Sequence, residues 1–352
     1  MSQPFRLNKE GLINRNKKIS FTFNGKKLFG YEGDTIASAL IANGIHLVGR
    51  SFKYHRPRGF FGAGVEEPNA KLQVEFNGHS EPNVNATEME LVEGLSATSQ
   101  NCWPSVNFDI GAINNFLKMF FPAGFYYKTF MWPKSFWYKI YEPFIRKAAG
   151  LGVASIEKDK ERYEHKFEYC DLLVTGSGPS GLASAYAAAK NGAKVILAED
   201  KPRFGGTLLT DDVSIDNLSG KDWAEKIITE LKSMPNVTVK NRSQVFGYYD
   251  HNMLVMFERV SDHLEKKSKF TPRQRLWYIR AKETILSTGS IERPIVFGNN
   301  DTPGIFLSAA AKEYMKVYGV LVGKKPLIFT NNDSAYETAL EFKKNNVEPI
   351  IL

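Results

Sequence analysis

A glycine-rich turn between an apolar strand and a helix limits what this chain can fold into more than any other feature. The apolar run Leu172–Val174 leads into Gly176-Ser177-Gly178-Pro179-Ser180-Gly181, and an alanine-rich segment continues to Lys190. The first glycine permits a tight turn, the second lets the backbone approach a pyrophosphate, and the third lets the helix pack against the strand. Free N–H groups at the helix N-terminus favour the negative charge of a pyrophosphate. The pattern predicts a dinucleotide-binding βαβ unit.

The second half of this unit carries an acidic residue in register. The strand Val195–Leu197 ends near Glu199, which lies 23 positions after Gly176, close to the spacing of a group that bonds a ribose hydroxyl. A further strand, Thr284–Leu286, runs into a small Thr-Gly turn that lets the backbone pass close to a dinucleotide. The predicted cofactor-binding residues are Gly176, Ser177, Gly178, Pro179, Ser180, Gly181, Glu199, Asp200, Gly205, Gly206, Thr207, Thr288 and Gly289.

The fingerprint alone does not separate NAD from FAD, because both ligands present the same ADP half. Glu199 would repel a 2′-phosphate, which favours NAD over NADP, although Lys201 and Arg203 weaken that inference. We expect NAD in this site, with FAD as the alternative.

Short strands and one helix are predicted before residue 100. Ile19, Phe21 and Phe23 alternate with polar residues before Asn24-Gly25, a hairpin signal that recurs at Asn77-Gly78. Asp34-Thr35 can cap a helix over 36–43 that ends at Gly44. A β-grasp domain is expected over residues 1–100, followed by an α/β Rossmann-like FAD/NAD-binding domain over 167–352.

The connecting region, residues 101–166, is rich in aromatic residues and proline, so short helices and ordered loops are expected. Its aromatic side chains indicate packing between the flanking domains or a subunit interface. The charged stretch 157–166 is interpreted as a solvated helix or linker. A second α/β unit follows Gly323, with a strand at 326–329, a helix at 335–344 and a strand at 349–352. Because it ends on a strand with no covering helix, we expect an N-terminal portion of a longer protein, truncated in this unit.

Composition excludes several classes of function. The two cysteines, Cys102 and Cys170, share no metal-ligand spacing, so no metal site and no disulfide scaffold is expected. The net charge of +8 is scattered rather than gathered into a stripe, which argues against nucleic-acid binding. The most apolar stretch, 116–132, is interrupted by Lys118, Pro122 and Lys128 and falls short of the about 20 residues a membrane span needs. No signal peptide is visible, and we expect a cytoplasmic protein without membrane contact.

Several strings together resemble the alpha subunit of heterotetrameric sarcosine oxidases. The most specific is Ser51-Phe52-Lys53-Tyr54-His55-Arg56-Pro57-Arg58-Gly59. The others are Glu66-Glu67-Pro68-Asn69-Ala70, Asn101-Cys102-Trp103-Pro104-Ser105, the fingerprint and Asn300-Asp301-Thr302-Pro303-Gly304. The fingerprint also belongs to a wider superfamily that includes hydrogen cyanide synthase and dye-linked proline dehydrogenase subunits.

The resemblance implies an oxidoreductase acting on CH–NH donors. Its reaction would convert sarcosine, tetrahydrofolate and O2 to glycine, 5,10-methylenetetrahydrofolate and H2O2. It implies beta, gamma and delta partner subunits and a small-molecule substrate. NAD would lie in this chain, FAD in the beta subunit and FMN at the alpha–beta boundary. The first domain would look like a two-iron ferredoxin, but residues 49–76 contain no cysteine, so no iron–sulfur cluster is expected.

Two alternatives stay open beside this interpretation. One is an FAD-dependent amine or amino-acid dehydrogenase subunit of the proline dehydrogenase or hydrogen cyanide synthase type. The other is a non-catalytic scaffold that a nucleotide stabilises. No catalytic residue is assigned, because the resemblance places sarcosine oxidation at the flavin of another subunit, and the part described here is expected to be inactive alone.

Overall fold

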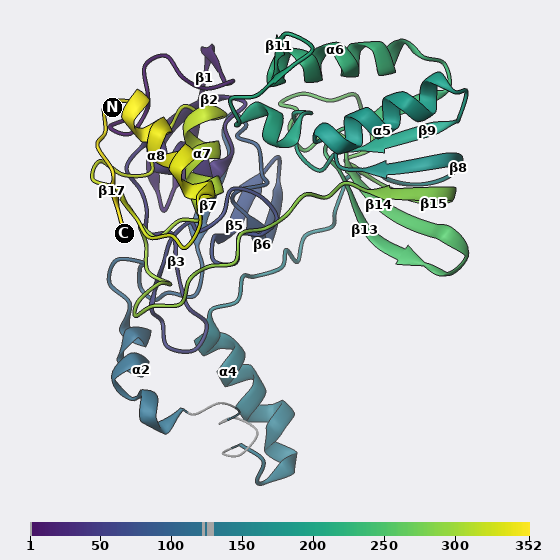
Figure 1. The fold of residues 1–352 in the computed structure, drawn as a ribbon. Helices are drawn as coiled ribbons and strands as arrows, with labels where there is room; N and C mark the ends of the chain where they lie inside the picture. The colour runs from purple at the N-terminus through teal and green to yellow at the C-terminus, as the bar shows by residue number, and fades with distance from the viewer. Residues whose placement is uncertain (1, 122–123, 125–129) are drawn as a thin grey trace. The chain divides into compact units, whose positions relative to one another are not determined.

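The computed structural model describes residues 2–121, 124 and 130–352, and the chain forms two compact units (Figure 1). The first unit comprises Met1–Asp159 and Arg293–Leu352, and the second comprises Lys160–Glu292. This division differs from the predicted boundaries of 1–100, 101–166 and 167–352 chiefly in where residues after 292 belong. The domain boundaries themselves stay a prediction.

A five-stranded mixed sheet forms the centre of the first unit among the described residues, in the order β2-β1-β7-β5-β6. Strand β1 is antiparallel to β2 and parallel to β7, while β5 is antiparallel to both β7 and β6. The predicted hairpins at Asn24-Gly25 and Asn77-Gly78 are present, and all four residues have positive φ, as a tight hairpin turn requires. The bounds are β1 Asn14–Phe23, β2 Lys26–Glu32, β3 Gly49–Arg50, β4 Pro57–Arg58, β5 Lys71–Phe76, β6 His79–Asn85 and β7 Ser96–Ser99.

The predicted first helix is α1, Ile36–Ala42, and every one of its side chains is buried. Thr35 caps it by accepting a hydrogen bond from the Ser38 amide, and the Ser38 hydroxyl oxygen accepts one from the Thr35 amide. This reciprocal capping box satisfies two backbone donors that the helix cannot satisfy itself. The sheet and the buried helix together give the β-grasp arrangement expected from the sequence.

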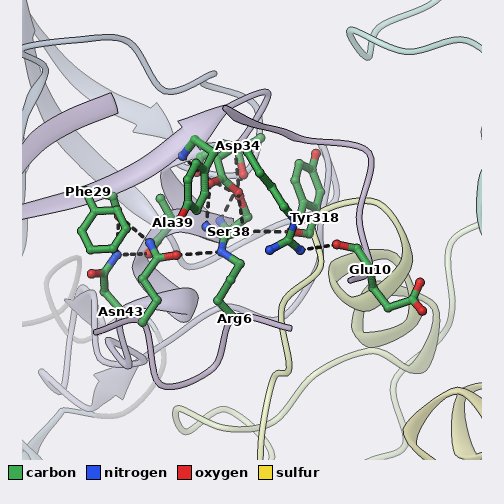
Figure 2. Close-up of polar contacts among 12 residues, drawn as sticks. Arg6, Glu10, Phe29, Asp34, Ser38, Ala39, Asn43 and Tyr318 are labelled. Atoms are coloured by element: carbon green, nitrogen blue, oxygen red, sulfur yellow. Dashed lines mark hydrogen bonds and ion pairs between the residues drawn. The ribbon is translucent and has the colours of Figure 1, made fainter. Parts of the chain in front are cut away.

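A buried ion pair joins the N-terminal arm to α1 (Figure 2). The Arg6 guanidinium donates to both carboxylate oxygens of Asp34, at 3.1 and 2.6 Å, and to the Tyr318 carbonyl at 2.8 Å. The Asp34 side chain is fully buried, and it also accepts from the Ser38 hydroxyl at 2.7 Å. Segments that lie more than 300 positions apart in the sequence thus meet at one guanidinium.

Residues after 292 pack on the first unit rather than continuing the second, which explains the difference in boundaries. Helix α7, Ser308–Lys316, buries Tyr314, whose hydroxyl donates to the Gly62 carbonyl at 3.0 Å. The predicted strand–helix–strand that follows is present as β16 (Leu327–Ile328), α8 (Ser334–Lys344) and β17 (Ile350–Ile351). Strands β16 and β17 pair in parallel.

The described residues of the aromatic segment form short helices joined by loops, as predicted, and many of their side chains are exposed. Phe116 and Trp132 are 84% and 83% exposed. Residues 122–123 and 125–129 of this stretch lie outside the described residues. The elements are η1 Ile110–Ala112, α2 Ile113–Phe116, η2 Lys118–Phe120, η3 Lys134–Phe136, η4 Trp137–Tyr141 and α4 Glu142–Ala149.

The second unit is built on a six-stranded mixed sheet in the order β12-β9-β8-β15-β14-β13. The first four strands are parallel, and β14 and β13 continue the sheet as an antiparallel meander. The strands are β8 Tyr163–Thr175, β9 Val195–Ala198, β12 Val237–Lys240, β13 Ser243–Tyr249, β14 Met253–Arg259 and β15 Gln274–Leu286. The other elements are α5 Pro179–Lys190, η5 Gly206–Leu209, β10 Ser214–Ile215, β11 Leu218–Ser219, α6 Gly220–Ser233 and η6 Asp250–Asn252.

Strand β8 corrects the interpretation of the charged stretch. It begins at Tyr163, so the end of that stretch is a strand and not a solvated helix or linker. Its long partner β15 pairs with it from Gln274 to Leu286. Interstrand hydrogen bonding therefore orders residues whose charge alone suggested solvent exposure.

Apolar side chains alternate to the two faces of the parallel strands. Helices α5 and α6 cover one face, as Figure 1 shows, and Leu172, Val174 and Leu182 belong to that cluster. The opposite cluster joins Leu173 and Ile196 to Leu254 and Met256 of the meander strand β14. Because both faces are covered, the loops at the carboxyl ends of the parallel strands are held on a rigid base.

Candidate functional site

The segments predicted to bind a dinucleotide converge at the carboxyl edge of the second unit's parallel strands. The chain runs from β8 through α5 to β9 on one side, and returns with β15 on the other side of β8. The strand order therefore reverses at β8, and open α/β sheets bind ligands in the crevice at such a switch point. Backbone hydrogen bonds connect the chain segments at this edge. The Gly176 N–H donates to Ala198 O at 2.8 Å, and the Ser287 N–H donates to Thr175 O at 2.8 Å.

Two of the three fingerprint glycines occupy positions where a Cβ would clash with the backbone. Gly176 has φ +97°, and a Cβ there would lie 2.2 Å from the Ser287 carbonyl oxygen. A Cβ on Gly181 would lie 1.9 Å from the Gly176 carbonyl oxygen, so close packing of helix on strand requires a glycine. A Cβ on Gly178 meets nothing within 4 Å. The first and third glycines are thus required by the fold, whereas the second faces open space.

The N-terminus of α5 is suited to an anion. Gly178 is the N-cap residue and supplies no side-chain cap, while Pro179 occupies the first turn without an N–H to satisfy. Ser180 in the same turn is exposed, and Gly181 is buried. The N–H groups and the positive end of the helix dipole are oriented to hold a phosphate there.

Glu199 is buried, with 6% of its surface exposed, and its carboxylate turns toward the fingerprint. Its Oε2 accepts from the Ser177 amide at 2.9 Å and from the Ser177 hydroxyl, and its Oε1 accepts from the Lys201 amide at 3.1 Å. The backbone of Glu199 pairs with Lys240 and Ser243, at 2.8 Å in each case. The predicted acidic residue and the predicted turn are therefore in direct contact.

Burial, and after it the neighbouring Asp200 carboxyl group, raise the pKa of Glu199 to about 7. The Ser177 hydroxyl and the Lys201 amide act in the opposite direction, because they stabilise the charged form. Glu199 consequently changes its charge near neutral pH, where an ordinary glutamate is fully ionised.

The remaining predicted residues are distributed around this contact. Gly205, with φ +124°, donates its N–H to the Ser177 hydroxyl at 3.1 Å. Gly206, with φ +53°, lies so close that its Cβ would be 2.9 Å from Gly178 Cα. Thr207 is exposed in η5, and Asp200 is half-buried. Thr288 and Gly289 are exposed just beyond β15, and Gly289 has φ +71°.

Sequence reasoning missed the support that comes from the turn between β12 and β13 and from the end of β14. The Arg242 amide donates to the Lys201 carbonyl at 3.1 Å, and the Arg259 guanidinium donates to the Asp200 carbonyl at 2.8 Å. These contacts fix the loop after β9. No local sequence motif indicates these two contacts, because they depend on which strands become neighbours in the sheet.

In the first unit, two strings that carried the family resemblance meet each other. Arg56 donates to both carboxylate oxygens of Asp301, at 2.9 and 2.7 Å, and Arg58 also donates to that carboxylate. The Arg56 and Arg58 contacts lower the pKa of Asp301 to about 2. His55 lies 2.6 Å from Asp109 through Nδ1. Arg56 and Arg58 therefore pair with Asp301, and His55 pairs with Asp109. Both contacts join segments that are far apart in the sequence.

A buried carboxylate organises the loop between β4 and β5. Glu67 is 2% exposed and accepts from the backbone N–H groups of Phe61, Gly62, Asn69 and Ala70, at 2.6, 2.7, 2.7 and 3.1 Å. Burial raises its pKa, and these four N–H groups lower it. The neighbouring Glu66 accepts from Ala63 at 2.7 Å and from Gly64 at 3.0 Å.

Within the described part of the chain, no three His, Cys, Asp or Glu side chains gather closely enough to hold a metal ion. No helix in those residues combines the length and the apolar character needed to cross a bilayer.

Two family models match the chain. One, described as a 2Fe-2S iron-sulfur cluster binding domain, covers residues 16–102, and the other, described as FAD dependent oxidoreductase, covers residues 171–254. The first corresponds to the β-grasp part and the second contains the fingerprint. The prediction of a ferredoxin-like domain followed by an FAD-type oxidoreductase domain is confirmed at this level.

The match over 16–102 contradicts the expectation that no iron–sulfur cluster belongs to this chain, and that prediction is corrected. Biological two-iron clusters of this kind are held by four cysteine thiolates. Residues 16–102 supply one thiolate, Cys102, and Glu67 takes the loop N–H groups at 61, 62, 69 and 70. A four-thiolate arrangement does not fit these residues. The preference for NAD over FAD is also revised, since the second model names FAD.

The chain is similar along nearly its whole length to sarcosine oxidase alpha subunits. It is 51% identical to "Sarcosine oxidase subunit alpha" of Rhizobium meliloti (strain 1021) over 348 residues, covering 99% of this chain and 35% of that protein. It is 34% identical to the protein of the same name from Corynebacterium sp. (strain U-96), covering 97% of this chain and 31% of that one. The chain thus spans about a third of the length of these relatives.

A solved structure shares the fold. L-proline dehydrogenase from P. horikoshii superposes with a TM-score of 0.67 at 21% identity, covering 99% of this chain and 55% of that chain.

Proposed function

We propose, from the premise that this chain is homologous over 99% of its length to sarcosine oxidase alpha subunits, that it is the dinucleotide-binding part of an FAD-dependent oxidoreductase subunit. The observation that carries the proposal is the convergence of the Gly178 turn, the uncapped N-terminus of α5 and the buried Glu199 at one strand edge. The first two features would serve the pyrophosphate and the third would serve the ribose of the same ligand.

Different residues would bind different parts of the ligand. The N–H groups at the start of α5 would hold the pyrophosphate, and the bare Gly178 would let it approach the backbone. Glu199 would accept a hydrogen bond from a ribose hydroxyl of the adenosine half. Gly205, Gly206 and Thr207 would border the pyrophosphate, while Thr288 and Gly289 would lie beside the ligand as it leaves the switch point. FAD, once bound, supplies the two-electron acceptor.

The substrate and the assembly rest on the relatives. We extend to the whole protein the oxidation of sarcosine, a secondary amine, because the relatives bear the name sarcosine oxidase. Tetrahydrofolate and O2 as co-substrates belong to the same proposal and come from the family resemblance of the sequence. Partner subunits follow from the same names, which designate an alpha subunit. No residue of this chain is assigned to the chemical step.

Substitution of Gly178 by alanine tests the site without disturbing the fold. Because the added Cβ meets nothing within 4 Å and φ is −64°, the protein should keep its thermal stability. A dinucleotide that contacts this backbone would be pushed away, and we expect FAD affinity to fall at least about tenfold. Gly298→Ala is the matched control, since Gly298 also faces open space but lies outside the second unit. Equal FAD affinity in both variants would contradict the proposed site.

A further inference from the structure

Ser177 connects three segments of the proposed site through one small side chain. It is fully buried, its hydroxyl donates to Glu199 Oε2, and that hydroxyl accepts from the Gly205 amide at 3.1 Å. Its own amide also donates to Glu199 Oε2, at 2.9 Å. The turn after β8, the end of β9 and the loop before η5 therefore share one hydroxyl.

The chemistry of this contact requires a serine. A hydroxyl offers one donor and two acceptor lone pairs, and both kinds of capacity are used here. Glycine or alanine would leave the Gly205 N–H without this acceptor and would remove one donor from a buried carboxylate. The Gly205–Gly206 loop lies against Gly178, so its anchoring also sets the width of the space beside the turn.

The contacts also determine which carboxylate oxygen can meet a ligand. Each carboxylate oxygen accepts about two hydrogen bonds. Ser177 supplies two donors to Oε2, whereas Oε1 accepts from the Lys201 amide. Among the described residues, Oε1 therefore has one donor fewer than Oε2, and the Asp200 carboxyl group is the other hydrogen-bonding neighbour of Glu199.

We propose that Ser177 is a positioning residue that presents Glu199 Oε1 to a ribose hydroxyl and holds the Gly205–Gly206 loop against the phosphate-binding turn. This inference rests on the proposed function, because it assumes that a dinucleotide binds at the switch point. It differs from a direct cofactor contact: Ser177 acts through Glu199 and Gly205.

The charge of Glu199 gives the proposal a measurable signature. A carboxylate accepts a ribose hydroxyl more strongly than a protonated carboxyl does, so nucleotide affinity should rise with pH across about 7. The Ser177 hydroxyl favours the charged form, and its removal should move this midpoint upward. The charged residues around the loop are Asp200, Lys201, Lys240, Arg242 and Arg259, of which Lys240 pairs with Glu258 at 3.1 Å.

The test uses the full protein freed of bound nucleotide and titrated with FAD between about pH 5.5 and 8.5, a range that brackets the Glu199 transition. Ser177→Ala should shift the midpoint of affinity upward by about one pH unit and weaken binding about tenfold at the acidic end. Ser177→Gly, which also suits a tight turn, should give the same shift and guards against a folding artefact. Ser184→Ala, within α5, should leave the profile unchanged.

Glu199→Gln supplies the decisive comparison. Glutamine cannot ionise, so FAD affinity should not depend on pH in this variant. Adding Ser177→Ala to it should leave the profile flat. If Ser177→Ala and Ser177→Gly keep the midpoint of the unaltered protein, the positioning role is wrong even though nucleotide binds. If the unaltered protein binds FAD at no pH, the proposed function fails, and this inference fails with it.

Discussion

Replacement of Arg6 by alanine should destabilise the first unit by about 3–5 kcal/mol, the range found when one partner of a buried ion pair is removed. Asp34 is fully buried and Arg6 is 6% exposed at the side chain, so neither charge is solvated by water in the folded protein. The substitution leaves the Asp34 carboxylate with the Ser38 hydroxyl and the Tyr31 amide as donors. It also removes the donor to the Tyr318 carbonyl.

Two control variants separate the buried pair from ordinary surface charge. Lys17→Ala breaks the Lys17–Glu32 pair, whose side chains are 46% and 47% exposed, and should cost no more than about 1 kcal/mol. Arg6→Met combined with Asp34→Leu removes both charges and should recover most of the loss, because the desolvation cost disappears with them.

Native-state hydrogen exchange is the suitable assay, because a chain of two units does not unfold in a single transition. The amides of Ala39 and Asn43, which donate within α1, report opening of this unit. Arg6→Ala should lower their protection free energy by the amount given above. A loss below about 1 kcal/mol, equal to that of Lys17→Ala, would refute the argument that residues near 318 are locked to α1 through Arg6.

Three further outcomes follow from the same contacts. Glu67→Gln should lower the stability of the first unit by at least about 2 kcal/mol, because an amide NH2 would face two N–H donors that now meet a carboxylate oxygen. Urea unfolding followed by amide hydrogen exchange at residues 61–70 measures this loss, and an unchanged unfolding midpoint would count against it. Asp301 has a folded pKa of about 2 against 3.8, so it contributes stability above about pH 4 that is lost as pH falls toward 2; Asp301→Asn should flatten this part of the acid-unfolding curve, and an identical curve would contradict the assignment. Gly181→Ala should lower the melting temperature of the second unit, since its Cβ would lie 1.9 Å from the Gly176 carbonyl oxygen, whereas Gly323→Ala, facing open space, should not; equal melting temperatures would show that the turn yields easily.

Local signals in the sequence predicted local structure well. The hairpins at Asn24-Gly25 and Asn77-Gly78, the Thr35 cap and the fingerprint turn each depend on the backbone preferences of a few adjacent residues. Such preferences operate in the chain before any tertiary contact forms. They predicted where α5 begins and assigned Gly176 and Glu199 to the same binding site.

Contacts between distant segments were not visible in the sequence. The Arg6–Tyr318 bond and the Arg56–Asp301 pair each join residues more than 240 positions apart, so no local pattern assigned residues after 292 to the first unit. The sequence predicts too short a strand β8, because the residues at its start, around Tyr163, are charged. Pairing with β15 orders them in the structure. The Ser177–Glu199 contact was missed for the same reason, although both residues were named as cofactor-binding.

The identity of the nucleotide carried by the purified full-length protein tests the central claim most directly. The protein would be denatured, and the released small molecule would be identified by its absorbance spectrum and mass, with Gly178→Ala protein prepared in parallel. We expect FAD from the unaltered protein and a much reduced amount from the variant. Flavin retained equally by both proteins, or no dinucleotide in the unaltered one, would contradict the assignment of the Gly176–Glu199 region as the binding site.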